Sequence, residues 1–245
     1  MGNNWRTQAV MNFFHAVNAT PASTRIIQSN LLYSYNPKNT NSYPGSGSTL
    51  YDLQGNVDLT ITGATYNGNG YFDFDGINDQ IKSPNYTLSL PNTTLGVWVK
   101  FDASTGLRMT FTLWNSSGFK GYQIYWNGAT SRMSFRVEDN AGNFSTLIPV
   151  FTLVTGTWYY LAMSWDNTSK SLKGYVYDGT GLALSSSGTA SGVDTSASMT
   201  SVYNALSDSA YAVDGSIGEA HAYTTPLSQT EITQNYNSTK SRYGY

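Results

Sequence analysis

The feature that most constrains this chain is a series of short stretches in which apolar and polar residues alternate. Residues 95–101, 122–126, 133–137 and 159–165 each place an apolar side chain at every second position. A period of two is typical of a half-buried strand, because successive side chains point to opposite faces. Asn-Gly and Asp-Gly pairs separate the stretches and signal turns. Many short strands at this spacing indicate a β-sandwich or barrel.

The composition supports one all-β domain. A chain of 245 residues suits a single large sandwich, and 40% of its residues are hydrophobic, enough to form a core. The 19 Tyr, 10 Phe and 6 Trp favour strands over helices. No repeat of about 20–50 residues is visible, so a propeller or solenoid is not favoured.

Several classes of function are excluded by what the chain lacks. Its net charge is −2 and it carries no basic block, so we expect no nucleic-acid partner. The absence of Cys removes disulfides, thiolate metal sites and cysteine nucleophiles. No apolar run approaches the roughly 20 residues of a membrane span. Asn12 and His15 interrupt the first apolar stretch, so no cleaved signal peptide is predicted.

The two ends of the chain carry helical signals. Four apolar residues near the start have i, i+3, i+4, i+7 spacing: Val10, Phe13, Phe14 and Val17. This segment either packs on its own domain or forms an arm that docks on a neighbouring subunit or partner. We divide the chain into an N-terminal arm or attachment segment, residues 1–30, and a domain, residues 31–245. Near the other end, Ser228 and Glu231 form a capping box that predicts a short helix.

Four pieces in the expected order resemble the laminin G-like jelly roll of the concanavalin A-like lectin/glucanase superfamily. They are F-D-F-D-G-I-N-D at 72–79, T-W-Y-Y-L-A at 157–162, K-G-Y-V-Y-D-G at 173–179, and the final strand and helix at 217–223 and 226–237. The resemblance implies an all-β fold, a two-sheet antiparallel jelly-roll sandwich, over residues 31–245.

A further segment, residues 39–56, resembles a form common in bacteriophage structural proteins that carry this domain. The resemblance implies a virion component, either a capsid decoration protein or a piece of a fibre. Fold-level analogy of this kind raises a hypothesis about function without establishing it.

An enzymatic role is not supported by the residue inventory. Glycoside hydrolysis needs two carboxyl groups about 5–10 Å apart, and the glutamates Glu138, Glu219 and Glu231 do not form the E-x-D-x-x-E strand pattern of glucanases. His15 and His221 accompany no G-x-S-x-G nucleophile motif. We therefore expect a non-enzymatic protein.

Two ligand sites are candidates. Calcium prefers oxygen ligands, and those offered here are Asp75, Asn78, Asp79 and Asp214; the alternative is that they close Asx turns. The I-D-E sequence common in relatives reads Ile-Gly-Glu at 217–219. No cofactor is required, and calcium is the one metal considered. Sugar stacks on aromatic rings, and the candidates are Trp114, Tyr122, Tyr125, Trp126 and Asn127; the alternative is that these aromatics belong to the core.

Two functions remain in competition. The first is a non-enzymatic structural protein on the outer surface of a virus particle, with other virion proteins and copies of itself as partners. The second is a carbohydrate-binding lectin module that attaches to glycans of a host cell surface. A weak sugar site would then need multivalent display, and hence oligomerisation.

Overall fold

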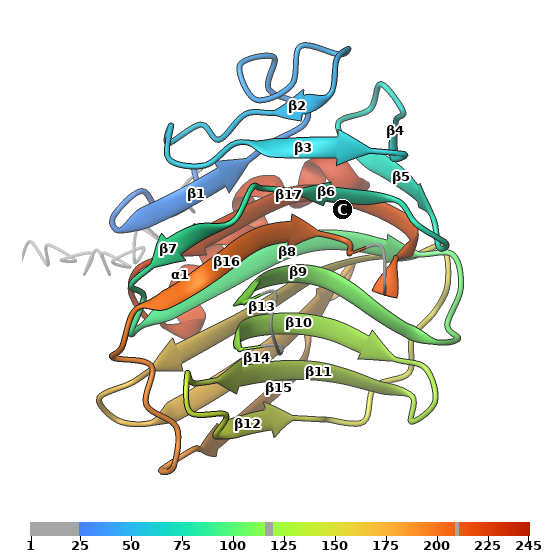
Figure 1. The fold of residues 1–245 in the computed structure, drawn as a ribbon. Coiled ribbons are helices and arrows are strands. Elements are labelled where there is room, and N and C mark those ends of the chain that lie inside the picture. The colour runs from blue at the N-terminus through green and yellow to red at the C-terminus, as the bar shows by residue number, and fades with distance from the viewer. Residues whose placement is uncertain (1–24, 116–119, 209–210) are drawn as a thin grey trace, which may run out of the picture.

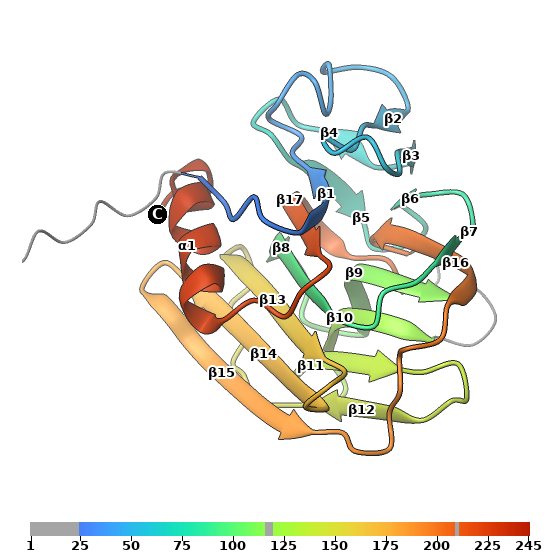
Figure 2. The ribbon, with the colours of Figure 1, turned by 90° about the vertical axis from the view of Figure 1, so that its left-hand side faces the viewer.

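The alternating stretches of the sequence become the strands of two antiparallel sheets. The computed structural model describes residues 25–115, 120–208 and 211–245. Within them the sheets pack face to face, and one short α-helix follows the last strand (Figures 1 and 2). This arrangement is the predicted all-β, two-sheet jelly-roll sandwich.

The first sheet, sheet A, contains eight strands in the described residues. In spatial order they are β15 (Gly181–Thr189), β14 (Ser171–Asp178), β13 (Trp158–Asp166), β8 (Thr93–Phe101), β17 (Asp214–Tyr223), β5 (Phe72–Asp75) and β4 (Thr65–Tyr66), with β1 (Leu31–Tyr35) also pairing with β17. Strand β15 lies at an edge of sheet A.

The second sheet, sheet B, contains nine strands in the same part of the chain. In spatial order they are β12 (Phe144–Leu147), β11 (Arg132–Glu138), β10 (Gly121–Asn127), β9 (Leu107–Asn115), β16 (Met199–Leu206), β6 (Gln80–Lys82), β3 (Leu59–Thr62) and β2 (Thr49–Leu50), with β7 (Tyr86–Leu88) also pairing with β16.

The main core lies between the two sheets. Alternate residues of the central strands meet there, such as Val97 and Leu161 from sheet A and Phe111, Ile124 and Phe135 from sheet B. Each is fully buried, and burial of such a side chain contributes roughly 1.5–3 kcal/mol. The period-two pattern is therefore satisfied by this inter-sheet contact.

A second core forms on the outer face of sheet A, where the C-terminal helices cover it. Helix α1 (Gln229–Thr239) begins at the predicted capping box, and the 3₁₀ helix η2 (Lys240–Tyr243) follows it. Trp98 of β8 stacks on Tyr243 with ring centroids 4.3 Å apart, and its Nε1 donates to Thr239 Oγ1 at 2.8 Å. Figure 2 shows α1 on this outer side of sheet A.

Most of the predicted N-terminal arm lies outside the described residues. Val10, Phe13, Phe14 and Val17 lie outside the described residues, so the boundary between residues 1–30 and 31–245 stays a prediction. Neither helix in the described part of the chain has the length and apolarity of a membrane-spanning helix.

Candidate ligand-binding sites

The outer face of sheet B carries the first candidate site, and strand register determines which side chains reach it. Gln123 lies opposite Thr112 on β9 and Arg136 on β11, and Tyr125 lies opposite Met109 and Ser134. Residues paired across strands share a face. A β-bulge in β9, beside the step from Ile124 to Tyr125, keeps Met109 on this face. We call this surface the sheet B outer face.

A pocket of about 250 Å³ opens on the sheet B outer face. Its lining residues are Leu107, Met109, Gln123, Tyr125, Arg136 and Tyr211. The pocket therefore combines two half-buried phenol rings with one amide and one guanidinium group. Pockets that bind small molecules are commonly built this way, from apolar and aromatic walls with a few polar groups.

Three side chains hold the guanidinium of Arg136 in place: Glu138, Thr146 and Phe144. Its Nη2 lies 2.5 Å from Glu138 Oε2, its Nη1 donates to Thr146 Oγ1 at 3.5 Å, and its Cζ lies 3.8 Å from the ring centroid of Phe144. The planar guanidinium suits both an ion pair and an aromatic face. The group is thus oriented before any ligand arrives.

Two buried hydroxyls on the same face have unused hydrogen-bonding capacity. Thr112 Oγ1 and Ser134 Oγ are inaccessible to solvent and make no hydrogen bond within the described part of the chain. A buried polar group left without a partner costs about 1–3 kcal/mol. Such groups are rare enough in native structures to point to a missing partner.

The predicted sugar-binding residues divide between the two faces of sheet B. Trp114 and Tyr125 lie on the sheet B outer face, and Asn127 lies half-buried at the end of β10. Tyr122 and Trp126 point the other way, into the inter-sheet core. The Tyr122 hydroxyl donates to Leu90 O, and Trp126 Nε1 donates to Ser104 O at 2.8 Å. Tyr122 and Trp126 are therefore core residues, and the prediction that they contact sugar is wrong.

The predicted calcium ligands lie near one another, but the carboxylates of Asp75 and Asp79 already accept hydrogen bonds from backbone amides. Asp75 is the cross-strand partner of Asp214. Its Oδ1 accepts from the amides of Ile77 and Asn78, which lowers the pKa of Asp75. Asp79 Oδ2 accepts from Asp75 N at 2.9 Å. No group of three or more His, Asp or Glu side chains in the described residues is arranged to hold a metal, and the Asp75 contacts are those of an Asx turn.

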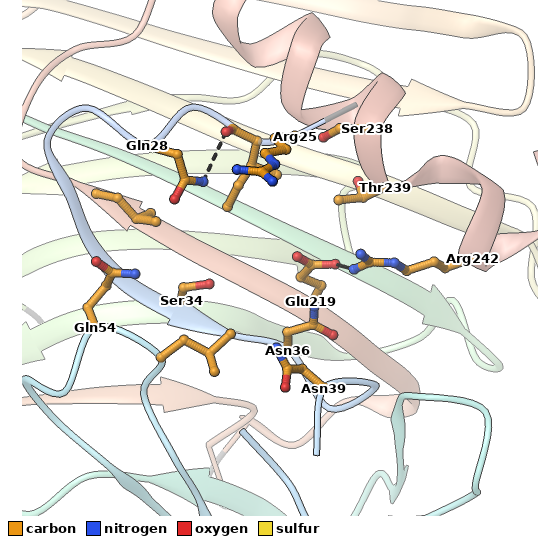
Figure 3. Close-up of a pocket in the computed structure, with 13 residues that line it drawn as sticks. Arg25, Gln28, Ser34, Asn36, Asn39, Gln54, Glu219, Ser238, Thr239 and Arg242 are labelled. Carbon is orange, nitrogen blue, oxygen red and sulfur yellow. Dashed lines mark hydrogen bonds and ion pairs between the residues drawn. The ribbon is translucent and has the colours of Figure 1, made fainter. Parts of the chain in front are cut away.

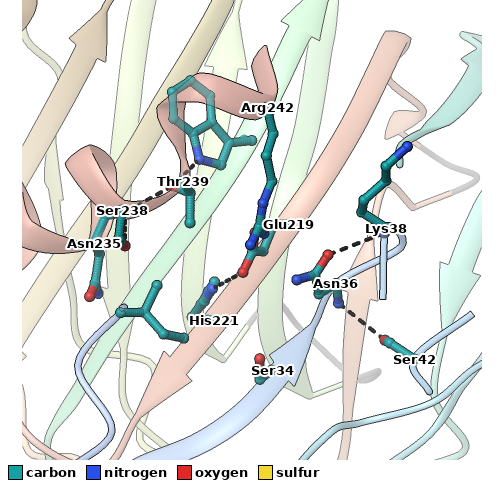
Figure 4. A network of polar contacts seen from close by, with 12 residues as sticks. Ser34, Asn36, Lys38, Ser42, Glu219, His221, Asn235, Ser238, Thr239 and Arg242 are labelled. Carbon is teal, nitrogen blue, oxygen red and sulfur yellow. Dashed lines mark hydrogen bonds and ion pairs between the residues drawn. The ribbon is translucent and has the colours of Figure 1, made fainter. Parts of the chain in front are cut away.

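A second site, which the sequence did not reveal, lies on the other side of the sandwich. Glu219 and His221 of β17 point outward under the C-terminal helices, and only 4% and 1% of their surfaces are exposed. Arg242 of η2 pairs with Glu219 Oε2, and Tyr243 Oη accepts from Glu219 N at 2.7 Å. Figure 4 shows Glu219 between His221 and Arg242.

Burial changes the protonation of this cluster. It raises the pKa of Glu219 to about 7 although Arg242 opposes the shift. It also lowers the pKa of His221 to about 3, and Arg242 adds to that effect. His221 Nε2 lies 3.0 Å from Glu219 Oε1 but without hydrogen-bond alignment. The imidazole is therefore neutral at pH 7, and Glu219 is the member of the pair that titrates near neutrality.

A polar pocket of about 350 Å³ lies beside Glu219. Its side chains come from four separate segments: residues 25–39 before, in and after β1, the loop after β2, β17, and the α1–η2 pair (Figure 3). We call it the Arg242 pocket. The residues that give it its chemistry are Arg25, Gln28, Asn36, Asn39, Glu219 and Arg242.

The chain has recognisable relatives at the level of a family. The family model described as the concanavalin A-like lectin/glucanases superfamily matches residues 75–233. No curated protein matches the chain at a significant level.

Solved structures with the same fold include toxin and sialidase chains. The botulinum neurotoxin serotype G binding domain superposes with a TM-score of 0.62 at 12% identity, over 86% of this chain and 52% of that one. The serotype D ligand binding domain in complex with N-acetylneuraminic acid gives 0.60 at 13%, over 85% and 50%. Trypanosoma rangeli sialidase gives 0.64 at 15%, over 94% and 36%.

These likenesses concern the fold alone, because the identities are low. The chain spans about half of the toxin binding domains and about a third of the sialidase chain. The family match is the firmer finding, since it covers more than half of the 245 residues. The chain belongs to the concanavalin A-like lectin/glucanases superfamily and is a lectin-like jelly-roll domain.

Proposed function

We propose that this lectin-like domain binds carbohydrate on the sheet B outer face. The observation that carries the proposal is the pocket where Tyr125 and Tyr211 meet Gln123 and Arg136. Aromatic rings supply a flat apolar surface for a sugar ring, and the amide and guanidinium supply donors and an acceptor for its hydroxyls.

Two of the solved structures with this fold support carbohydrate as the class of ligand. One toxin domain of this fold was determined in complex with N-acetylneuraminic acid, and the sialidase with a sugar-derived ligand. The residues of the sheet B outer face fit the binding of a sugar better than the hydrolysis of a glycosidic bond. No carboxyl group is among the described residues that line its pocket, whereas glycoside hydrolysis uses two.

Our second candidate is a role in assembly, as a surface component of a virion. It draws on the resemblance of residues 39–56 to bacteriophage structural proteins, and one structural observation favours a protein partner. Large apolar side chains are exposed beside β12, at the edge of the sandwich: Phe144, Ile148, Val150 and Val154. An exposed apolar patch is typical of a protein contact surface. Assembly would also give a weak sugar site the multivalency that it needs.

A glycan array with the full chain tests the carbohydrate proposal. We expect binding to one sugar class, and loss of it in Tyr125→Ala. The matched control is Tyr51→Ala, because Tyr51 is exposed and lies outside both pockets. A blank array from the folded protein, or equal signals from the two variants, would contradict the proposal.

A further inference from the structure

We propose that the Arg242 pocket is a second binding site, which takes a small hydroxylated carboxylate of the uronic acid type. The pocket lies on the sheet A side of the sandwich, away from the sheet B outer face. The two proposals therefore stand on different residues and can fail separately.

The charge of the pocket favours an anion. Arg25 and Arg242 line it from different segments, and Glu219 is the one carboxyl group among its described lining residues. The Arg242 side chain is 40% exposed and uses Nη1 for Glu219. A guanidinium has five N–H donors, so Arg242 keeps donors for a second oxygen ligand. The lining residues therefore include two guanidinium groups and one carboxyl group.

The remaining lining groups favour a hydroxylated acid. Amide side chains from Gln28, Asn36, Asn39 and Gln54 line the same pocket as the two guanidinium groups (Figure 3). Amides both donate and accept hydrogen bonds, as sugar hydroxyls do. The volume of about 350 Å³ lies in the range of small-molecule pockets. A carboxylate matches the planar guanidinium by paired hydrogen bonds, so we expect the pocket to prefer a carboxylate over a neutral sugar.

Glu219 competes with such a ligand for Arg242. When Glu219 is ionised it occupies the guanidinium and repels a second carboxylate, and when protonated it does neither. The charged or titratable groups that face it are Arg242 and Tyr243 of η2, His221 and Tyr223 of β17, and Tyr160 of β13. Burial keeps His221 and the three phenols neutral between pH 6 and 8, because it lowers the pKa of His221 and raises those of the tyrosines.

Ligand binding should therefore be coupled to protonation of Glu219. The pKa of Glu219 is about 7, and a bound carboxylate raises it further. If only the protonated form binds, affinity is about tenfold higher at pH 6 than at pH 8.

Titration calorimetry on the full chain tests this inference, with D-glucuronate as the probe and D-glucose and acetate as comparisons. We expect glucuronate to bind more tightly than either, with proton uptake that two buffers of different ionisation enthalpy reveal. Arg242→Gln should weaken glucuronate at least about tenfold. The matched control is Arg132→Gln, whose side chain contacts Ile148 O away from both pockets.

A second variant covers the case in which Arg242→Gln fails to fold. Glu219→Gln mimics the protonated carboxyl, so it should bind glucuronate at pH 8 as tightly as the wild type does at pH 6, without pH dependence. Equal affinity for glucose and glucuronate, or unchanged affinity in Arg242→Gln, would overturn the inference. If Tyr125→Ala alone abolished glucuronate binding, the Arg242 pocket would be refuted while the sheet B proposal stood.

Discussion

Two arginines occupy comparable positions on the two outer faces of the sandwich, and a buried carboxylate holds each of them. Arg136 pairs with Glu138 on sheet B, and Arg242 pairs with Glu219 on sheet A. A guanidinium oriented in this way is preorganised for a ligand oxygen. Glu219 differs from an ordinary surface partner, because burial raises its pKa to about 7. At the scale of single residues, the second site therefore has a built-in response to pH.

The effect of Glu219 on stability follows from the same shift. Its ordinary pKa is 4.5, so between pH 4.5 and 7 the folded state holds a proton that the unfolded chain releases. The stabilisation is present below pH 4.5 and is lost as the pH rises through 7, by up to about 3 kcal/mol. Glutamine lacks this dependence. In urea unfolding, Glu219→Gln should gain stability relative to the wild type between pH 5 and pH 8, whereas a constant difference would contradict the assignment.

The sequence predicts which side chains of β10 share a face, but not which face is buried. The period of two already separates Tyr122 and Trp126 from Tyr125, because they differ by an odd number of positions. The pattern does not say which side is the core, since both faces of β10 carry aromatics. That assignment depends on the facing sheet. Glu219 and His221 alternate with apolar residues in the final strand, which was a usable signal for a polar cluster on one face.

Among the helices and strands, local sequence signals predicted where an element begins, but they did not predict which distant strands pair. The Ser228–Glu231 capping box marks the start of α1, and both of its hydrogen bonds are present. By contrast, β17 pairs with β1, β5 and β8, which are distant in sequence, and no local pattern encodes that order. The Arg242 pocket depends on this pairing, so its four segments could not be brought together from sequence.

A substitution at Gly96 tests the close packing of β8 against β13 in sheet A. A Cβ added to Gly96 of β8 would collide with the hydroxyl of Tyr160 on β13, which is buried. Gly96→Ala should lower the free energy of unfolding by about 1–3 kcal/mol through overpacking. Gly192→Ala is the control, because a Cβ there meets open space. Equal thermal stability of the two variants would show that β8 and β13 do not pack as described.

At the scale of the whole molecule, the two sheets face different surroundings. Helices α1 and η2 cover the outer side of sheet A, whereas a pocket lined by Tyr125 and Tyr211 opens on the sheet B outer face. The apolar residues beside β12 lie along the sandwich edge. We propose the sheet B outer face as a carbohydrate site and the β12 edge as a contact for a protein partner, in addition to the Arg242 pocket on the sheet A side.

Self-association tests the exposed edge. Ile148 is 54% exposed beside β12, and Ile77 is 74% exposed in the turn between β5 and β6. We expect the wild type to form an oligomer through the β12 edge, because removal of apolar surface from water favours association. Light scattering should show Ile148→Lys shifted to monomer and Ile77→Lys unchanged. A wild type that stays monomeric at every concentration would contradict a homo-oligomer built on this edge.

Calorimetric titration of the sugar that binds most strongly on the glycan array tests directly whether the sheet B outer face binds carbohydrate. Two tyrosines three positions apart on β10 provide the comparison: Tyr125 on the sheet B outer face and Tyr122 in the core. We expect Tyr125→Ala to weaken binding about tenfold through loss of an aromatic contact, and Tyr122→Phe to leave the affinity unchanged. Unchanged affinity in Tyr125→Ala would contradict a carbohydrate site on the sheet B outer face.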